Sequence, residues 1–187
     1  KDGKLNVLIA ADGNLSAPKG MFTKDNYLFI CDVNKIMVYN LKALKETPQT
    51  IFFPEDDLFI NDLAADGNTL YASVTNSGKI YQIDITNPSN MSDITPIKWV
   101  DIIGPNGLII DNGIMYVASY PADGTTTDAN VIYQITDFAN PVVEKFTILP
   151  GQYDGIALSA DKKTMYITNW SPAGISCINM STRQITP

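Results

Sequence analysis

The stretch that decides the fold runs from Phe59 to Asp84 and reads FINDLAADGNTLYASVTNSGKIYQID. It predicts three short antiparallel strands, at Leu63–Ala65, Leu70–Val74 and Lys79–Asp84. The Asp66-Gly67 pair between the first two strands suits a two-residue hairpin turn, which needs positive φ angles. A polar loop then separates the second strand from the third.

The same pattern recurs four times along the chain. The second-strand segments are DNYLFICD, GNTLYASV, NGIMYVAS and KKTMYITN, which begin at Asp25, Gly67, Asn112 and Lys162. Each contains a large apolar residue followed by an aromatic residue, and these pairs lie about 45 residues apart. The third-strand segments KIMVYNL, KIYQIDI, VIYQITD and GISCINM align in the same order. This period, with several short strands in each unit, predicts a β-propeller in which each unit is one blade.

The 187 residues are predicted to form a single all-β propeller domain with four visible blades of about four antiparallel strands each. The blades are expected at approximately residues 17–53, 60–102, 105–149 and 152–187. A further apolar strand is predicted at Leu5–Ala10. It would either complete the last blade of a closed four-bladed ring or belong to a preceding blade of a longer propeller. An incomplete ring would expose two apolar blade faces, and the chain should then self-associate.

Composition excludes several classes of function. The formal net charge is −7 and no Lys/Arg cluster is present, which argues against nucleic acid or an anionic membrane as partner. No apolar run approaches the length of a membrane span. The chain has no His, so Ser-His-Asp and Cys-His catalysis are excluded within it. Cys31 and Cys177 are interpreted as small buried hydrophobic residues, which would form a disulfide only if the first and fourth blades adjoin.

The cellular compartment is not readable from this sequence. No signal peptide is visible, and the sequence does not begin with Met. The turns rich in Thr, Asn and Asp fit an exported bacterial protein, either periplasmic or secreted.

Propeller geometry predicts where a functional site would lie. The innermost strand of each blade starts at the end of the ring where the loops between second and third strands also lie, around the mouth of the central channel. The residues predicted to line this mouth include Lys19, Asn61, Asp62, Asn106, Tyr120, Asp154 and Trp170.

Three of these residues occupy one repeat position in consecutive blades: Asn61, Asn106 and Asp154. In a ring they would converge on the axis, and convergent oxygen ligands suit Ca²⁺ or another divalent cation. The alternative is that each merely satisfies a tight bend at the start of its strand, as Asn and Asp often do. The residues leave both interpretations open.

The segments FINDLAADGNTLYASV, GPNGLIIDNGIMYVAS and QYDGIALSADKKTMYITN resemble the senescence-marker-protein/gluconolactonase/luciferin-regenerating-enzyme family. More broadly, with APKGMFTKDNYLFICD, they resemble six-bladed propellers of the NHL type. The resemblance implies that this chain is part of a six-bladed ring. It also implies that Asn106 and Asp154 hold a divalent cation and that Asn61 contacts substrate. The chain departs from the family pattern at Phe59, where the family has Arg, and at Lys19, which stands where a metal-binding Glu is expected.

Two functions follow from these observations. The first is a binding or scaffold propeller that presents its Asn/Asp-rich mouth to a small polar ligand or a protein partner, with Lys19, Asn61, Tyr120 and Trp170 as ligand-contacting residues. The alternative is a divalent-metal-dependent lactonase-type hydrolase. In that case the metal would polarise a lactone carbonyl and lower the pKa of a bound water, and Asp154 would orient or deprotonate this water.

Overall fold

The computed structural model describes residues 3–186, and its regular structure consists of four antiparallel sheets of four strands. The first blade contains β1 (Met21–Lys24), β2 (Tyr27–Cys31), β3 (Lys35–Asn40) and β4 (Gln49–Phe52). The second contains β5 (Ile60–Asp66), β6 (Thr69–Val74), β7 (Lys79–Asp84) and β8 (Ile97–Asp101). The third contains β9 (Pro105–Asp111), β10 (Ile114–Ser119), β11 (Tyr133–Thr136) and β12 (Val142–Lys145). The fourth contains β13 (Tyr153–Leu158), β14 (Thr164–Asn169), β15 (Gly174–Asn179) and β16 (Ile185–Thr186).

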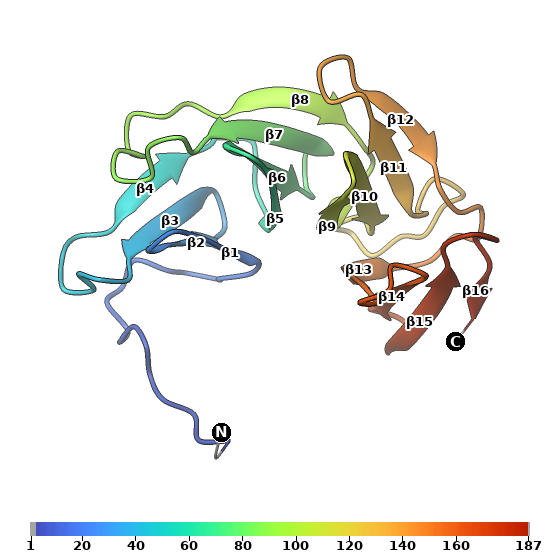
Figure 1. The fold of residues 1–187 in the computed structure, drawn as a ribbon, viewed down its shortest axis with the longest axis horizontal. Coiled ribbons are helices and arrows are strands. Elements are labelled where there is room, and N and C mark those ends of the chain that lie inside the picture. The colour runs from blue at the N-terminus through green and yellow to red at the C-terminus, as the bar shows by residue number, and fades with distance from the viewer. Residues whose placement is uncertain (1–2, 187) are drawn as a thin grey trace.

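The predicted propeller fold is confirmed. Within each blade the strands pair in chain order, so every blade is a simple up-and-down meander. Figure 1 shows the blades arranged around an open arc, with the innermost strands β1, β5, β9 and β13 turned toward its centre. No helix among residues 3–186 is long and apolar enough to cross a membrane.

The hairpin turns follow from the residues that tolerate positive φ. Gly67 has φ 57° in the second blade, and Asn112 and Gly113 have φ 49° and 72° in the third. These angles match the twist that a two-residue hairpin needs. Asp25 and Lys162 take the same conformation in the first and fourth blades. The turn residues therefore fix the register of the inner hairpin in every blade.

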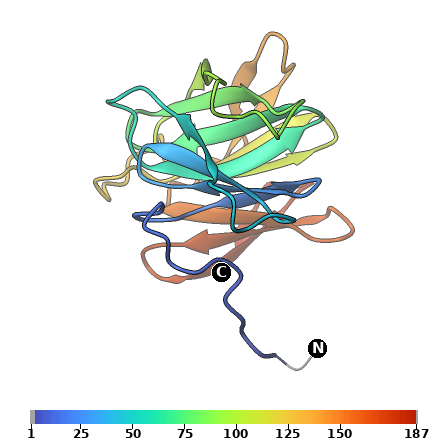
Figure 2. The same cartoon turned by 90° about the vertical axis from the view of Figure 1, so that its left-hand side faces the viewer.

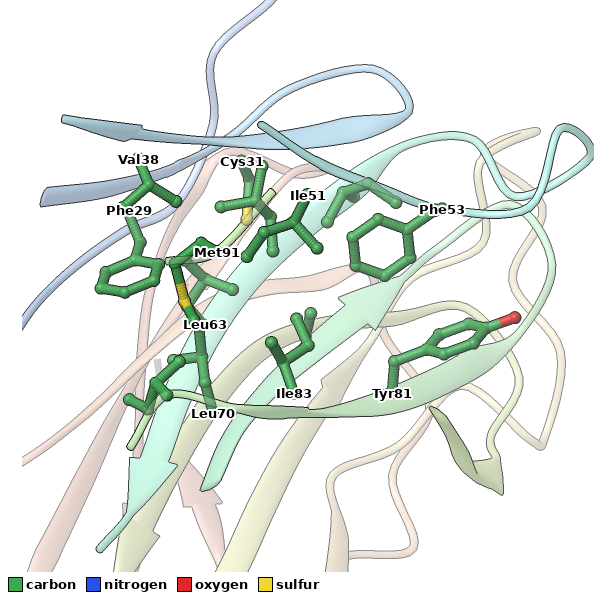
Figure 3. Packing of buried hydrophobic residues seen from close by; sticks show 14 of the residues in the cluster. Phe29, Cys31, Val38, Ile51, Phe53, Leu63, Leu70, Tyr81, Ile83 and Met91 are labelled. Carbon is green, nitrogen blue, oxygen red and sulfur yellow. The ribbon is translucent and has the colours of Figure 1, made fainter. Parts of the chain in front are cut away.

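Apolar clusters between successive blades form the core. Figure 3 shows the cluster between the first two blades, where Phe29, Ile51 and Met91 lie among side chains of both sheets. Tyr71 and Trp99 contact each other within the second cluster, with ring centroids 4.6 Å apart. A third cluster joins the third and fourth blades. Because each interior blade is buried on both faces, its strands lack the clean alternation of a sheet with one wet face.

The strand predicted at Leu5–Ala10 is wrong, because the structure contains no strand there. The outer edge of the fourth blade is already occupied by β16, whose Ile185 pairs with Ile178. This apolar segment therefore finds no strand to pair with, and Leu5, Val7 and Leu8 are exposed. Figure 2 shows the N-terminal residues leading away from the blades.

Candidate functional site at the channel mouth

The starts of the innermost strands come together as predicted from the repeat. The strands β5 and β9 contact each other, as do β9 and β13. The Gly20 N–H donates to the carbonyl of Asn61 over 2.7 Å, and the Ser73 hydroxyl donates to the carbonyl of Asn106 over 2.7 Å. These bonds fasten each strand start to the neighbouring blade.

Two glycines allow this close approach. A Cβ atom added to Gly20 would lie 2.5 Å from Oδ1 of Asp62, which is closer than a real contact allows. A Cβ atom added to Gly107 would clash with the carbonyl oxygen of Asp154. The glycines therefore bring the polar strand starts of adjacent blades into contact.

The loops predicted to share this surface also lie here. The Thr75 N–H donates to the carbonyl of Phe59, and the Tyr120 N–H donates to that of Gly104. In the fourth blade, the Trp170 N–H donates to the carbonyl of Gln152 over 2.9 Å. Each loop between second and third strands is thus tied to the segment that leads into its own inner strand.

Asp62 links the second blade to the third. Its Oδ2 accepts a hydrogen bond from the Leu108 N–H over 2.8 Å. Burial raises the pKa of this carboxyl, and the charge of Asp154 raises it further, against the hydrogen bonds from the backbone of Leu108 and Leu63. Asp62 was predicted from the sequence to lie at the channel mouth, without a specific role. This interblade bond depends on side-chain direction, which the repeat pattern does not specify.

Asn106 is the most buried polar strand-start residue at the mouth, with 5% of its surface exposed. Its carbonyl accepts the Ser73 hydroxyl, whereas its side-chain amide makes no hydrogen bond to residues 3–186. Among these residues the only buried side-chain nitrogen or oxygen without a partner is Oγ of Ser77, so the Asn106 amide reaches the surface of the channel. The Asn106 side chain is therefore available to water or to a ligand in the channel.

Asp154 lies at the same repeat position one blade further on and is half-buried. Burial raises the pKa of its carboxyl. No lysine or arginine among residues 3–186 forms an ion pair with it. The charge of Asp154 acts on Asp62, and neither carboxyl group has an ion-pair partner among residues 3–186.

Asn61 and Lys19 are engaged by the protein itself. Nδ2 of Asn61 donates to the Thr75 hydroxyl over 3.1 Å, and this hydroxyl donates to the Pro105 carbonyl. Nζ of Lys19 donates to the Ala17 carbonyl over 3.1 Å and lies 5.1 Å from the centre of the Phe59 ring. The predicted ligand contacts of both residues remain predictions.

The two aromatic residues predicted at the mouth contact each other. The rings of Tyr120 and Trp170 stack with centroids 6.1 Å apart and an interplanar angle of 24°, although they belong to loops of different blades. Trp170 is exposed. The pair forms a flat apolar surface on the third and fourth blades.

The oxygen atoms present fit a hard cation only in part. The side chains of Asp154 and Asn106 make no hydrogen bond to residues 3–186, and the bond of Asn61 uses Nδ2 and leaves Oδ1 unengaged, whereas Asp62 accepts through Oδ2. Residues 3–186 contain no group of three or more His, Cys, Asp or Glu placed to hold a metal. Oxygens from Asn61, Asn106 and Asp154 would leave the rest of the coordination shell of Ca²⁺ or Mg²⁺ to water or to a ligand.

Four meandering sheets packed face to face define the chain as a β-propeller. No family model matches its sequence. No curated protein matches it either.

The fold is similar to those of several solved propeller enzymes. A gluconolactonase from Xanthomonas campestris matches with a TM-score of 0.66 at 14% identity, covering 88% of this chain and 59% of that one. The periplasmic gluconolactonase of Pseudomonas aeruginosa matches with a TM-score of 0.64 at 14% identity, covering 91% and 52%. The virginiamycin B lyase of Staphylococcus aureus matches with a TM-score of 0.64 at 19% identity, covering 91% and 54%. The chain thus has a gluconolactonase-like propeller fold and spans little more than half the length of these proteins.

Proposed function

We propose that this chain is a binding module whose channel mouth takes a small polar ligand or a hydrated divalent cation, held by Asn106 and Asp154. The observation that carries the proposal is that the amide of Asn106, a residue only 5% exposed, makes no hydrogen bond to residues 3–186 and is open to the channel. A ligand that accepts from this amide or donates to its oxygen would gain a hydrogen bond without displacing a protein bond.

The electrostatics of the mouth favour a ligand with positive charge or with hydrogen-bond donors. Burial raises the pKa of Asp154 and of Asp62, so ionisation of each carboxyl group is costly. A cation or donor placed between Asp154 and Asn106 would offset this cost. Binding should therefore lower the pKa of Asp154 and release protons at acidic pH.

Calorimetric titration of Ca²⁺ and of Mg²⁺ into the chain tests the proposal. We expect binding that is weakened at least about tenfold by Asn106→Ala and by Asp154→Ala, the loss that one charge-assisted contact supplies. Asp123→Ala is the matched control, since this exposed aspartate bonds only within its own loop. Absence of binding for both metals, or binding that Asp123→Ala removes, would contradict a cation site at the mouth.

A lactonase-type hydrolase is the second candidate, and the similarity to two gluconolactonase folds favours it. A bound cation would supply carbonyl polarisation, and Asp154 would orient or deprotonate the attacking water. The raised pKa of Asp154 brings this carboxyl closer to the range of a general base. Turnover of glucono-δ-lactone that Asp154→Asn abolishes would support this activity. Hydrolysis at the rate of the buffer, under conditions where a cation binds, would exclude it for this substrate.

A further inference from the structure

One face of the fourth blade carries an uncovered apolar surface. Its residues are adjacent across the strands: Ala157 pairs with Tyr166, Tyr166 pairs with Cys177, and Thr168 pairs with Ile175. Paired residues of an antiparallel sheet point to the same side. We call this surface, formed by Ala157, Tyr166, Thr168, Ile175 and Cys177, the trailing face of the fourth blade.

The equivalent face is buried in every other blade. Phe29, Tyr71 and Tyr116 stand where Tyr166 stands and are 0–8% exposed, whereas Tyr166 is 44% exposed. The residues equivalent to Ile175 are Ile36, Ile80 and Ile132. All three are fully buried, whereas Ile175 is 62% exposed. In the first three blades, the next blade of the same chain covers this face.

The trailing face suits a contact between identical chains. None of its five residues is charged, although the chain as a whole carries a net charge of −7. Like charges that face each other across an interface destabilise it, and the trailing face carries no charged residue. Its apolar side chains would gain the usual benefit of burial if a matching surface covered them.

The opposite end of the arc presents the complementary kind of surface. Leu28, Ile30, Met37 and Tyr39 occupy the positions that, in the second blade, pack onto the first. We call these four residues the leading face of the first blade. They are covered by a segment of the same chain instead of by a blade, since Ile9 and Leu15 pack against them.

That covering segment is held by few bonds. Asp12 accepts from the Tyr39 hydroxyl over 3.2 Å, and the Asp32 carboxylate accepts from the backbone N–H groups of Ser16 and Ala17. No residue between 3 and 20 belongs to a strand. A groove of about 540 Å³ remains between the segment and the blade, lined by residues that include Ile9, Leu15 and Leu28. The segment therefore covers the leading face without filling the space that a blade would fill.

We propose that the trailing face of the fourth blade binds a second copy of this chain, through the leading face of that copy's first blade. The contact would repeat the blade-to-blade packing that already occurs three times within the chain. Residues 9–15 would have to leave the leading face, so this segment acts as a cap that competes with association. The Asp32 bonds to Ser16 and Ala17 would persist as the hinge.

The area of the trailing face determines how tightly two chains are expected to associate. The fourth blade has three strands of six residues and the two-residue β16, and its face measures at most about 15 by 20 Å. An interface of this size belongs to the weak and transient class. We therefore expect reversible association with a Kd of about 10 µM to about 1 mM.

Sedimentation velocity over about 5 to about 500 µM protein measures this association. The chain should show a sedimentation coefficient that rises with concentration. Ile175→Asp should abolish the rise, because it places a charge on the trailing face, at its most exposed isoleucine. Ile97→Asp is the matched control, because Ile97 is equally exposed on β8 of the second blade but lies outside both faces. An unsubstituted chain that stays monomeric throughout, or equal loss with Ile97→Asp, would overturn the proposal.

Variants of the cap test which surface the second copy uses. Combined Ile9→Ser and Asp12→Ala substitutions remove the apolar and hydrogen-bonded anchors of the segment and should strengthen association by about tenfold. Val7→Ser, in the exposed part of the same segment, should change nothing. If the double variant associates no more strongly than the original chain while Ile175→Asp abolishes association, the assignment to the leading face is overturned. That result would indicate two fourth blades packed on each other.

The reactivity of Cys177 provides a second measurement on the unaltered chain. Cys177 lies on the trailing face and is partly exposed, whereas Cys31 is buried and burial raises the pKa of its thiol. Reaction with Ellman's reagent should therefore report Cys177, and its rate should fall as protein concentration rises. A rate independent of concentration, in samples that sediment as associated species, would place the contact elsewhere and overturn the proposal.

Discussion

At the scale of single residues, the mouth is built by contacts between neighbouring blades. Asp62 on β5 accepts from the backbone of Leu108 on β9, and Gly107 lies against the carbonyl of Asp154 on β13. The repeat in the sequence predicted which residues start these strands. It could not predict that Asp62 bonds to the next blade while Asn106 stays without a partner, because both depend on side-chain direction within the ring.

Substitution of Asp62 separates its hydrogen bond from its charge. Asp62→Ala leaves the Leu108 N–H without its partner and should lower the free energy of unfolding by about 1–3 kcal/mol. Asp62→Asn keeps an acceptor oxygen and removes a charge that burial disfavours, so it should be at least as stable as the original chain at pH 7. Urea unfolding of both variants measures the difference. Equal destabilisation by Asn and Ala would contradict the interpretation.

The raised pKa of Asp62 also sets the sign of a pH dependence. A carboxyl whose pKa is higher in the folded than in the unfolded chain binds protons on folding. Its contribution to the unfolding free energy therefore falls as the pH rises from the unfolded value toward the folded one, and is constant above that. The stability difference between Asp62→Asn and the original chain should accordingly grow as the pH rises above about 4. A difference that shrinks over this interval would show that the folded pKa is lowered.

Gly107 tests the close approach of the third and fourth blades. Gly107→Ala forces a methyl group onto the backbone of Asp154 and should cost about 1–3 kcal/mol of unfolding free energy, as overpacking does. Gly174→Ala is the control, since nothing lies within 4 Å of its Cβ position and its φ is not positive. Chemical denaturation of the pair checks this. Similar stability of the two variants would mean that the blades separate easily at this point.

At the scale of elements, the inner hairpins were predicted well because turn residues define them. The strand Lys79–Asp84 agrees with β7, and Gly67 of the predicted Asp66-Gly67 turn has the positive φ expected of it, 57°. The strand expected at Leu5–Ala10 fails because strand formation needs a partner with free backbone groups, and none lies beside it. Apolar sequence alone cannot supply that partner.

The connection between the first and second blades depends on a buried carboxylate. Asp57 lies in the loop between β4 and β5, where it pairs with Nζ of Lys79 at 2.8 Å and accepts from the Tyr81 hydroxyl. Burial opposes ionisation of Asp57, but the bonds from these partners outweigh it and hold the pKa of the carboxyl below its usual value. The ionised group therefore anchors the loop to β7.

Replacing Asp57 should expose this contribution. Asp57→Asn loses the charge that binds Lys79 and should lower the unfolding free energy at pH 7 by about 1–3 kcal/mol. Because the folded pKa is lowered, the stabilisation is present above the unfolded pKa and disappears as the pH falls toward the folded value. The difference in unfolding free energy between Asp57→Asn and the original chain should therefore become smaller below about pH 4 in acid-unfolding curves. A deficit that is the same at pH 3 and at pH 7 would contradict the ion pair.

At the scale of the whole molecule, the period near 45 residues predicted the propeller because each repeat is one packing unit. The repeat does not indicate which blade faces lie at an end of the arc in Figure 1, and the exposure of Cys177 is the consequence. Cys177 was expected to be buried like Cys31, yet it is partly exposed because no blade covers the trailing face.

The second and fourth blades are buried to different extents, so their backbone amides should be protected from hydrogen exchange to different extents. The second blade packs on both faces, whereas the fourth packs on one. Regions with fewer buried contacts open more readily. Backbone amides of β14 should therefore exchange hydrogen at least about tenfold faster than those of β6 in dilute protein, measured by mass spectrometry. Equal protection of the two strands would mean that the trailing face is covered in solution.

The central claim is that Asn106 and Asp154 form the ligand-holding part of the mouth. The most direct test is a crystal of this chain soaked in Mn²⁺ and measured for anomalous scattering, with Mn²⁺ standing in for the hard cations of the titration. We predict a peak bonded to the Asn106 amide oxygen and the Asp154 carboxylate, at about the 2.0–2.6 Å typical of hard cations with oxygen ligands. Crystals in which Mn²⁺ binds elsewhere, with Asn106 and Asp154 hydrogen-bonded only to each other, would contradict the claim.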